Sequence, residues 1–224
     1  MKVSRGFLIR AAAVVSMSAL LLTSGGVVEA QTTGVQLTPT ASVASAAGLQ
    51  STLSTLFIEH VDLSLATMRA AYDGFGSPNF QGAAGALDQN SVDISNLVGQ
   101  VYGANNQAQF LELWRKHIDY LNTYALAAKN NDQSLKQQAL NNLNNVAAPG
   151  MANFLNQLNP NLPVDTVTQE LRNHEQDMLS AFDAYAAGNF AASYSGQLTG
   201  DSHASMFAAM VSNAIVRQHP SQYP

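Results

Sequence analysis

The sequence contains no cysteine among its 224 residues. This absence excludes disulfide bonds, a cysteine nucleophile and the lipid-modified cysteine of a lipoprotein. The chain also lacks a G-x-S-x-G nucleophile elbow, an H-E-x-x-H zinc motif and a glycine-rich phosphate-binding loop. We therefore assign no catalytic residue and favour a protein that is not an enzyme.

Long apolar runs are almost absent as well. The longest, Ala11–Leu22, is too short to span a bilayer. It follows three basic residues and precedes a small-residue cleavage site that ends at Ala30, which is the pattern of an export signal. We predict a signal peptide over residues 1–30 and a secreted or periplasmic protein with no stable membrane insertion after cleavage. A retained amino-terminal anchor is the alternative.

Charged residues are scarce, at 11% of the chain. Removal of residues 1–30 takes away Lys2, Arg5, Arg10 and Glu29, which leaves 7 basic and 14 acidic residues and a net charge of −7. This balance argues against nucleic-acid or anionic-lipid partners, which require basic patches. Residues 31–48 are rich in Thr, Ser, Ala and Gly and are predicted to form a flexible leader, with one folded domain over residues 49–224.

Three histidines recur at a constant interval. His60, His117 and His174 are 57 residues apart, and each is preceded three residues earlier by Phe57, Trp114 or Leu171. Fourteen residues after each histidine is a Gly or Asn, a residue type that ends a helix in the left-handed conformation. A repeated supersecondary unit explains these shared positions.

Apolar residues around each histidine recur at steps of three and four, which predicts an amphipathic helix in each unit. A second, less regular helix follows in each unit, and no segment has the alternation of a strand. The predicted fold is all-α: one bundle of about six helices in three antiparallel hairpins, with ferritin-like packing. The hairpin units span about residues 49–103, 104–162 and 163–224.

Local signals add detail to this prediction. Ser77-Pro78 is expected to start a helix, and Asp132 is expected to cap another. Thr166 with Gln169 has the spacing of a capping box. Pro149-Gly150 is expected to kink or break the second helix of its unit. In the third unit, a short helix over 190–198 is expected to stop before the chain restarts at Gly200-Asp201.

The repeated histidines lie on the apolar stripes, so they are candidates for a shared metal site in the core. Imidazole and thioether groups together suit copper, ahead of iron or zinc. The predicted ligand set comprises His60, His117, His174, His203, Met178, Met206 and Asp93. The predicted function is a non-enzymatic, exported metal-binding protein.

Two other interpretations remain open. The histidines can instead hydrogen-bond within the core of a structural or interaction module that meets an envelope or extracellular partner. An oxidative di-metal enzyme is less favoured, because a ferritin-like site needs a glutamate three residues before a histidine. Glu59 directly precedes His60, and Glu170 lies four residues before His174.

Several segments carry a family resemblance. They are Phe-Ile-Glu-His60, Leu-Trp-Arg-Lys-His117, the Asp-Ile-Ser-Asn stretch at Asp93, Asn-Phe-Leu-Asn-Gln-Leu-Asn-Pro160, and His203 with the Met-Phe-Ala-Ala-Met and Ile-Val-Arg-Gln-His-Pro220 stretches that follow it. Over residues 52–224 the chain resembles a family of secreted bacterial and archaeal helical-bundle proteins built from histidine-containing hairpin repeats. The resemblance implies no catalytic residue. Members of that family often have an Asp-Glu pair where this chain has Pro149-Gly150, which weakens any site that needs a carboxylate from the second unit.

Overall fold

The computed structural model describes residues 45–224, and within them every regular element is helical and no strand occurs. The elements are α1 (Ala46–Gly74), α2 (Pro78–Tyr102), α3 (Ala104–Lys129), α4 (Gln133–Asn142), the π-helix η1 (Leu143–Ala147), α5 (Ala148–Leu158), α6 (Val164–Ala186) and α7 (Phe190–Gln218). The all-α prediction is confirmed for this part of the chain. The predicted signal peptide and residues 31–44 of the leader lie outside the described residues, and α1 begins within the last part of that leader.

Hydroxyl and carboxylate caps begin three of the helices. The Ser45 hydroxyl accepts a hydrogen bond from the backbone N–H of Gly48 at the start of α1. Ser77 caps α2 ahead of Pro78, as predicted, and Asp132 caps α4. Each cap satisfies a backbone N–H that has no partner within its own helix.

The predicted left-handed positions are confirmed in two of the three units. Asn131 and Gly188 have φ angles of 55° and 74°, and each lies two residues after the end of its helix, α3 or α6. In the first unit the left-handed residue is Gly76, with φ 79°, rather than Gly74. The chain there turns two residues later than the repeat predicts.

Pro149 does not break the second helix of its unit. Instead α4, η1 and α5 follow one another without a gap, and Pro149 lies in the first turn of α5. Proline lacks an N–H donor, and its ring collides with the carbonyl four residues earlier in a regular α-helix. The wider π turn immediately before it accommodates this conflict.

Two further expectations in the third unit are wrong. The capping box is not formed, because α6 already begins at Val164 and Thr166 lies inside it. The helix over 190–198 does not stop before Gly200, and α7 is continuous for 29 residues. A Cβ at Gly200 would lie 3.2 Å from Val61 Cγ1, so the glycine permits a close approach of α7 to α1.

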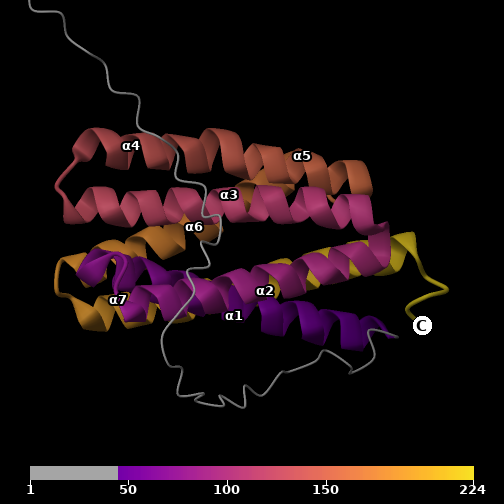
Figure 1. The fold of residues 1–224 in the computed structure, drawn as a ribbon. Coiled ribbons are helices and arrows are strands. Elements are labelled where there is room, and N and C mark those ends of the chain that lie inside the picture. The colour runs from indigo at the N-terminus through magenta and orange to yellow at the C-terminus, as the bar shows by residue number, and fades with distance from the viewer. Residues whose placement is uncertain (1–44) are drawn as a thin grey trace, which may run out of the picture. The chain divides into compact units, whose positions relative to one another are not determined.

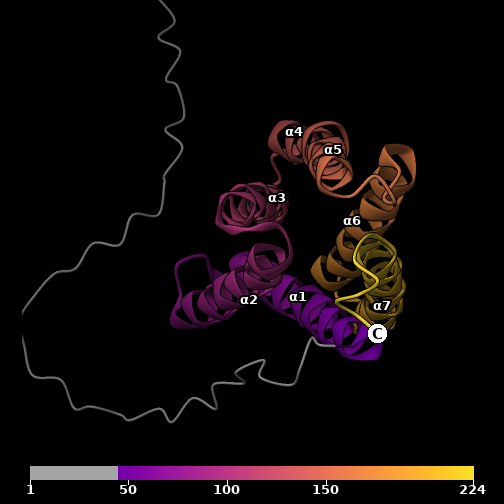
Figure 2. The same cartoon turned by 90° about the vertical axis from the view of Figure 1, so that its right-hand side faces the viewer.

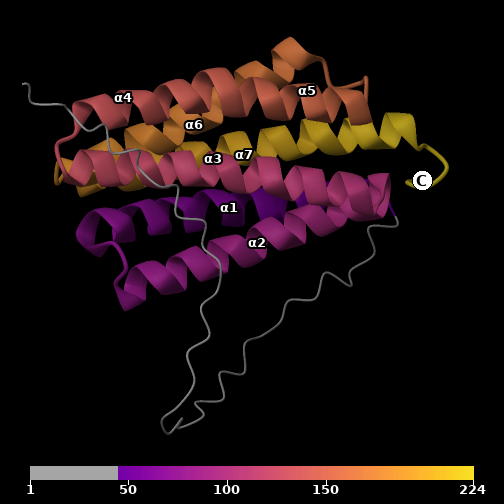
Figure 3. The ribbon, with the colours of Figure 1, turned by 45° about the horizontal axis from the view of Figure 1, so that its top comes forward.

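The long helices lie side by side (Figures 1 and 3). Viewed along their axes, α1 lies between α2 and α7 (Figure 2), and it also packs against α3 and α6. One continuous apolar core joins all of these helices, with Val61, Leu65, Met68 and Phe182 fully buried. The helices that carry the repeated histidines, α1, α3 and α6, therefore contact one another inside the bundle.

Within residues 45–224, no helix has both the length and the apolar character needed to cross a membrane.

Two glycines in helix interiors provide a matched pair for testing helix packing. A Cβ added at Gly85 in α2 would meet no atom within 4 Å, whereas one at Gly196 in α7 would lie 3.1 Å from the Cβ of Ala181. We expect Gly85→Ala to raise the free energy of unfolding by about 0.5–1 kcal/mol, because alanine loses less backbone entropy in a helix. Gly196→Ala should not show this gain, because α7 must move away from α6. Urea denaturation measures both, and an equal gain would show that the α6–α7 contact is looser than described.

Candidate metal centre

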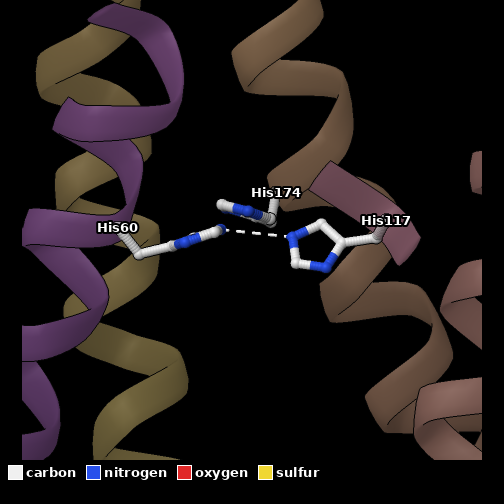
Figure 4. Close-up of side chains that lie close together, drawn as sticks. All are labelled: His60, His117 and His174. Carbon is white, nitrogen blue, oxygen red and sulfur yellow. Dashed lines mark hydrogen bonds between the residues drawn. The ribbon is translucent and has the colours of Figure 1, made fainter. Parts of the chain in front are cut away.

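The three repeated histidines meet in the core. His60 projects from α1, His117 from α3 and His174 from α6, and their rings point toward one another (Figure 4). Each stands on the apolar stripe of its helix, so the packing that buries the stripe also brings the ring inward. His60 and His117 are 1% and 7% exposed, and the Nε2 atom of His174 is buried. The expectation that these three rings meet in the core is confirmed.

The distances between the rings are short. The Nε2 atoms of His60 and His117 are 3.2 Å apart, and one nitrogen from each histidine lies within 4.8 Å of the others. Metal–imidazole bonds of about 2.0–2.1 Å at tetrahedral angles place two ligand nitrogens about 3.3–3.4 Å apart. The His60–His117 pair already has this spacing, and His174 needs a small movement to complete a three-nitrogen site.

Aromatic rings enclose the histidines on one side. The Trp114 ring centroid lies 4.7 Å from the centroids of both His60 and His117. Trp114 itself stacks against Phe110 at 5.1 Å and Phe57 at 6.0 Å. This wall excludes water from one side of the histidines and fixes the ring orientations through packing.

Burial keeps all three histidines neutral. Burial, together with the positive charge that His174 would carry, lowers the pKa of His117 to about 3. Burial also lowers the pKa of His174 to about 4, while the Asp177 carboxylate acts in the opposite direction. The pKa of His60 is held well below its ordinary value, first by burial and then by the neighbouring imidazoles. Only a neutral imidazole has the lone pair that binds a metal ion.

The hydrogen bonds among the rings do not satisfy every nitrogen. One Nε2–H in the His60–His117 pair donates to the other Nε2. His60 Nδ1 and His174 Nε2 are buried and have no hydrogen-bond partner among residues 45–224. Each buried polar atom without a hydrogen-bond partner lowers the stability of the folded protein by roughly 1–3 kcal/mol. The cluster is therefore not a fully satisfied polar core. An ion that binds His174 Nε2 would relieve the cost at that atom, whereas His60 Nδ1 is not the nitrogen that faces His117 and would still need another partner.

A small cavity of about 20 Å³ connects this cluster to polar residues. Its lining includes His60, His174, Glu170 and His203. The His203 Nδ1–H donates to the carboxylate of Asp177, which fixes the ring. A cavity needs roughly 10–15 Å³ to hold one water molecule, so a single water or ligand atom fits between His203 and the buried rings.

The other predicted ligands are less close. His203 lies at the cavity but outside the three-nitrogen cluster. Met178 is buried one turn after His174, whereas the side chain of Met206 is 57% exposed. Asp93 is half-buried on α2 and accepts a hydrogen bond from Gln89. The structure thus brings together the three repeated histidines with His203 beside them, and it places Met206 in solvent.

Two acidic residues of α6 were not singled out from the sequence. Nothing in the sequence marks Asp177, because its partner His203 is 26 residues away on another helix and is brought close only by the fold. Glu175 is 3% exposed, and its Oε2 has no partner in the described part of the chain. Burial raises the pKa of Glu175 to about 8. A sequence sign was present here, since Glu175 lies four residues after Leu171 and four before Leu179 on the apolar stripe.

No protein-family model matches the chain, and no curated protein or solved structure is similar to it.

Proposed function

We propose that the protein is an exported, non-enzymatic protein that binds a transition metal ion through His60, His117 and His174. The observation that supports this most directly is the presence of three imidazole nitrogens, two of them from buried histidines, within 4.8 Å of one another. The low pKa values of His117 and His174 add to it, because the rings are ready to bind without losing a proton.

Copper is the favoured ion, ahead of iron and zinc. Nitrogen ligands bind Cu²⁺ more tightly than the other divalent ions of the first transition row. The exposed side chain of Met206 removes part of the thioether argument for Cu⁺, so the choice depends on the imidazoles. A fourth position toward the small cavity would be completed by water or by the free nitrogen of His203.

Metal titration of the purified protein tests the proposal. We expect Cu²⁺ to bind at one ion per chain and to raise the melting temperature, because an ion that binds only the folded state adds about 2.7 kcal/mol at one hundred times its dissociation constant. Native mass spectrometry gives the stoichiometry, and calorimetry gives the melting temperature. His117→Gln should lose both effects.

His219→Gln provides the matched control. His219 lies beside Tyr102 near the carboxyl terminus, away from the cluster. This variant should bind copper as the original protein does. Unchanged mass and melting temperature of the original protein with copper, zinc and iron would disprove the metal-binding proposal.

The same titration decides the second candidate function, a structural or interaction module of the cell envelope with a metal-free histidine core. The hydrogen bond between His60 and His117 favours this alternative, since it gives the apo rings a partner. The unpartnered, buried Nε2 of His174 argues against it.

Two further parts of the proposal rest on the sequence. Export depends on the signal-like residues 1–30, and amino-terminal sequencing of the protein recovered outside the cytoplasm would test cleavage after Ala30. The three-unit repeat, with antiparallel hairpins and ferritin-like packing, is supported by the 57-residue histidine interval and by the placement of the three histidines on α1, α3 and α6. A partner in the envelope remains part of the second candidate only.

A further inference from the structure

A second cavity lies in the core beside the histidines. It has a volume of about 40 Å³, twice that of the histidine-lined cavity, and its walls come from α1, α2, α3, α5 and α7. Ile94, Leu97 and Phe110 are among the fully or nearly fully buried residues that line it. Side chains normally fill the interior of a folded protein, so an unfilled cavity of this size in the apolar core calls for an explanation.

The lining is entirely apolar. No polar surface within the described residues faces this cavity, although Tyr102 contributes to the wall. A buried water needs two to four polar partners, and apolar cavities stay dry or take up apolar molecules. Water is therefore a poor occupant, and so is any charged or strongly polar ligand.

The walls are held in place and do not depend on an occupant. Phe110, Trp114 and Phe57 form a continuous stack with centroid separations of 5.1 and 6.0 Å. At the far end, the Tyr102 hydroxyl donates to Gln218 and accepts from Asn159. The stacked rings, and a tyrosine hydroxyl held by two hydrogen bonds, keep the side chains of the wall from collapsing into the cavity, as expected for a preformed pocket.

The cavity shares part of its wall with the histidine cluster. Phe57, Trp114 and Phe207 line both cavities. A molecule in this cavity therefore contacts the same aromatic wall that encloses His60 and His117.

We propose that this cavity binds one small, uncharged, apolar molecule, of a size between dioxygen and a short hydrocarbon. The inference goes beyond the metal-binding proposal and does not depend on it, because the cavity is defined by apolar side chains alone. The recognition is by shape and by dispersion contacts with aromatic and aliphatic groups. No chemical step is implied.

Xenon is the probe, because it is apolar and occupies cavities of this kind. Trp114 is the only tryptophan in the sequence and lines the cavity, so its fluorescence reports on occupancy without a label. We expect quenching of Trp114 to rise and then saturate as the xenon pressure increases over the purified full-length protein. Collisional quenching alone rises linearly, and a purely linear response of the original protein would overturn the proposal.

Two variants with the same substitution localise the effect. Val98→Phe fills the cavity from α2 and should remove the saturable component. Val146→Phe makes the same change in η1 at a side chain that is 46% exposed, and should leave the component intact. Saturable quenching that persists in a folded Val98→Phe would place xenon elsewhere and refute the assignment. If Val98→Phe does not fold, Val211→Ile, which adds one methylene to the same wall, should weaken xenon binding in its place, and unchanged binding would refute it equally.

Copper quenching of Trp114 separates this proposal from the metal site. Copper bound at the histidines lies close to the indole and should quench Trp114 in Val98→Phe as well as in the original protein. His117→Gln should lose copper quenching but keep the xenon response. Loss of one response without the other identifies which of the two sites is absent.

Discussion

Acidification from pH 7 to pH 4 is expected to lower the free energy of unfolding of the metal-free protein by several kcal/mol. In the unfolded chain each histidine has a pKa near 6.5, whereas burial lowers the pKa of His117 to about 3 and of His174 to about 4 in the folded protein. His60 is displaced in the same direction. Below pH 6.5 the three histidines therefore bind protons in the unfolded state but remain neutral in the folded state until the pH falls to their lowered pKa values.

The sign and size of the effect follow from this difference. Each histidine that is protonated only in the unfolded state removes about 1.4 kcal/mol of stability per pH unit. The stability is complete above pH 6.5 and falls as the pH decreases toward the folded pKa values. Since most proteins have a total stability of about 5–15 kcal/mol, three such histidines bring the protein close to unfolding at pH 4.

Urea denaturation at pH 7, 6, 5 and 4 measures this dependence. His60→Phe keeps a ring in the core but removes one titrating group. The slope of its free energy of unfolding against pH should therefore be smaller by the contribution of one proton, about 1.4 kcal/mol per pH unit. Equal slopes for His60→Phe and the original protein would show that His60 is not held neutral by the fold.

The convergence of the histidines was predictable because two independent periods agree in the sequence. The 57-residue interval puts one histidine on the first helix of each unit, and the three- and four-residue apolar steps put each on the buried face. Since α1, α3 and α6 also pack against one another, the three rings lie on facing sides of these helices. Neither period alone fixes the 3.2 Å separation of His60 and His117, which depends on the packing of Trp114.

The exposure of Met206 has a geometric cause. Successive residues in an α-helix rotate by about 100°, so a residue three positions later lies about 60° away and one four positions later about 40° away in the opposite sense. His203 lies at the edge of the small cavity, so one of these rotations turns a side chain into the cavity and the other turns it toward solvent. Phe207 lines the cavity, whereas Met206 turns into solvent. Sequence spacing gives the helix face but not which side of His203 is buried.

The continuity of the helices in the second and third units was also beyond the sequence. Pro149 and Gly200 are both helix-disfavouring residues; a wider helical turn accommodates Pro149, and a close contact with a neighbouring helix explains Gly200. A π turn precedes Pro149, and Val61 packs where a side chain at Gly200 would lie. Local preferences predict a break at both places, because they contain no information about the neighbouring helix.

Glu175→Gln is expected to stabilise the protein at neutral and alkaline pH, by on the order of 3 kcal/mol at pH 7. Burial raises the pKa of Glu175 to about 8, with Arg172 acting weakly in the opposite direction. The ordinary pKa of a glutamate is near 4.5, so the unfolded state gains stability by ionising as the pH rises from 4.5 to 8 while the folded state keeps its proton. The contribution of the protonated carboxyl to stability is thus complete below pH 4.5 and is lost as the pH rises through 8.

Glutamine resembles the protonated carboxyl in shape and carries no titrating proton. The gain from Glu175→Gln should therefore be near zero at pH 4 and grow with pH, opposite in sign to the effect of the histidines. Glu112→Gln, at an exposed position of α3, is the matched control and should change stability little. Urea denaturation at pH 4, 6 and 8 measures the three proteins, and a gain from Glu175→Gln that is the same at every pH would mean that the carboxyl is already ionised in the folded protein. Together the two titrations predict a stability maximum between the acid loss from the histidines and the alkaline loss from Glu175, and Glu175→Gln should move that maximum to higher pH.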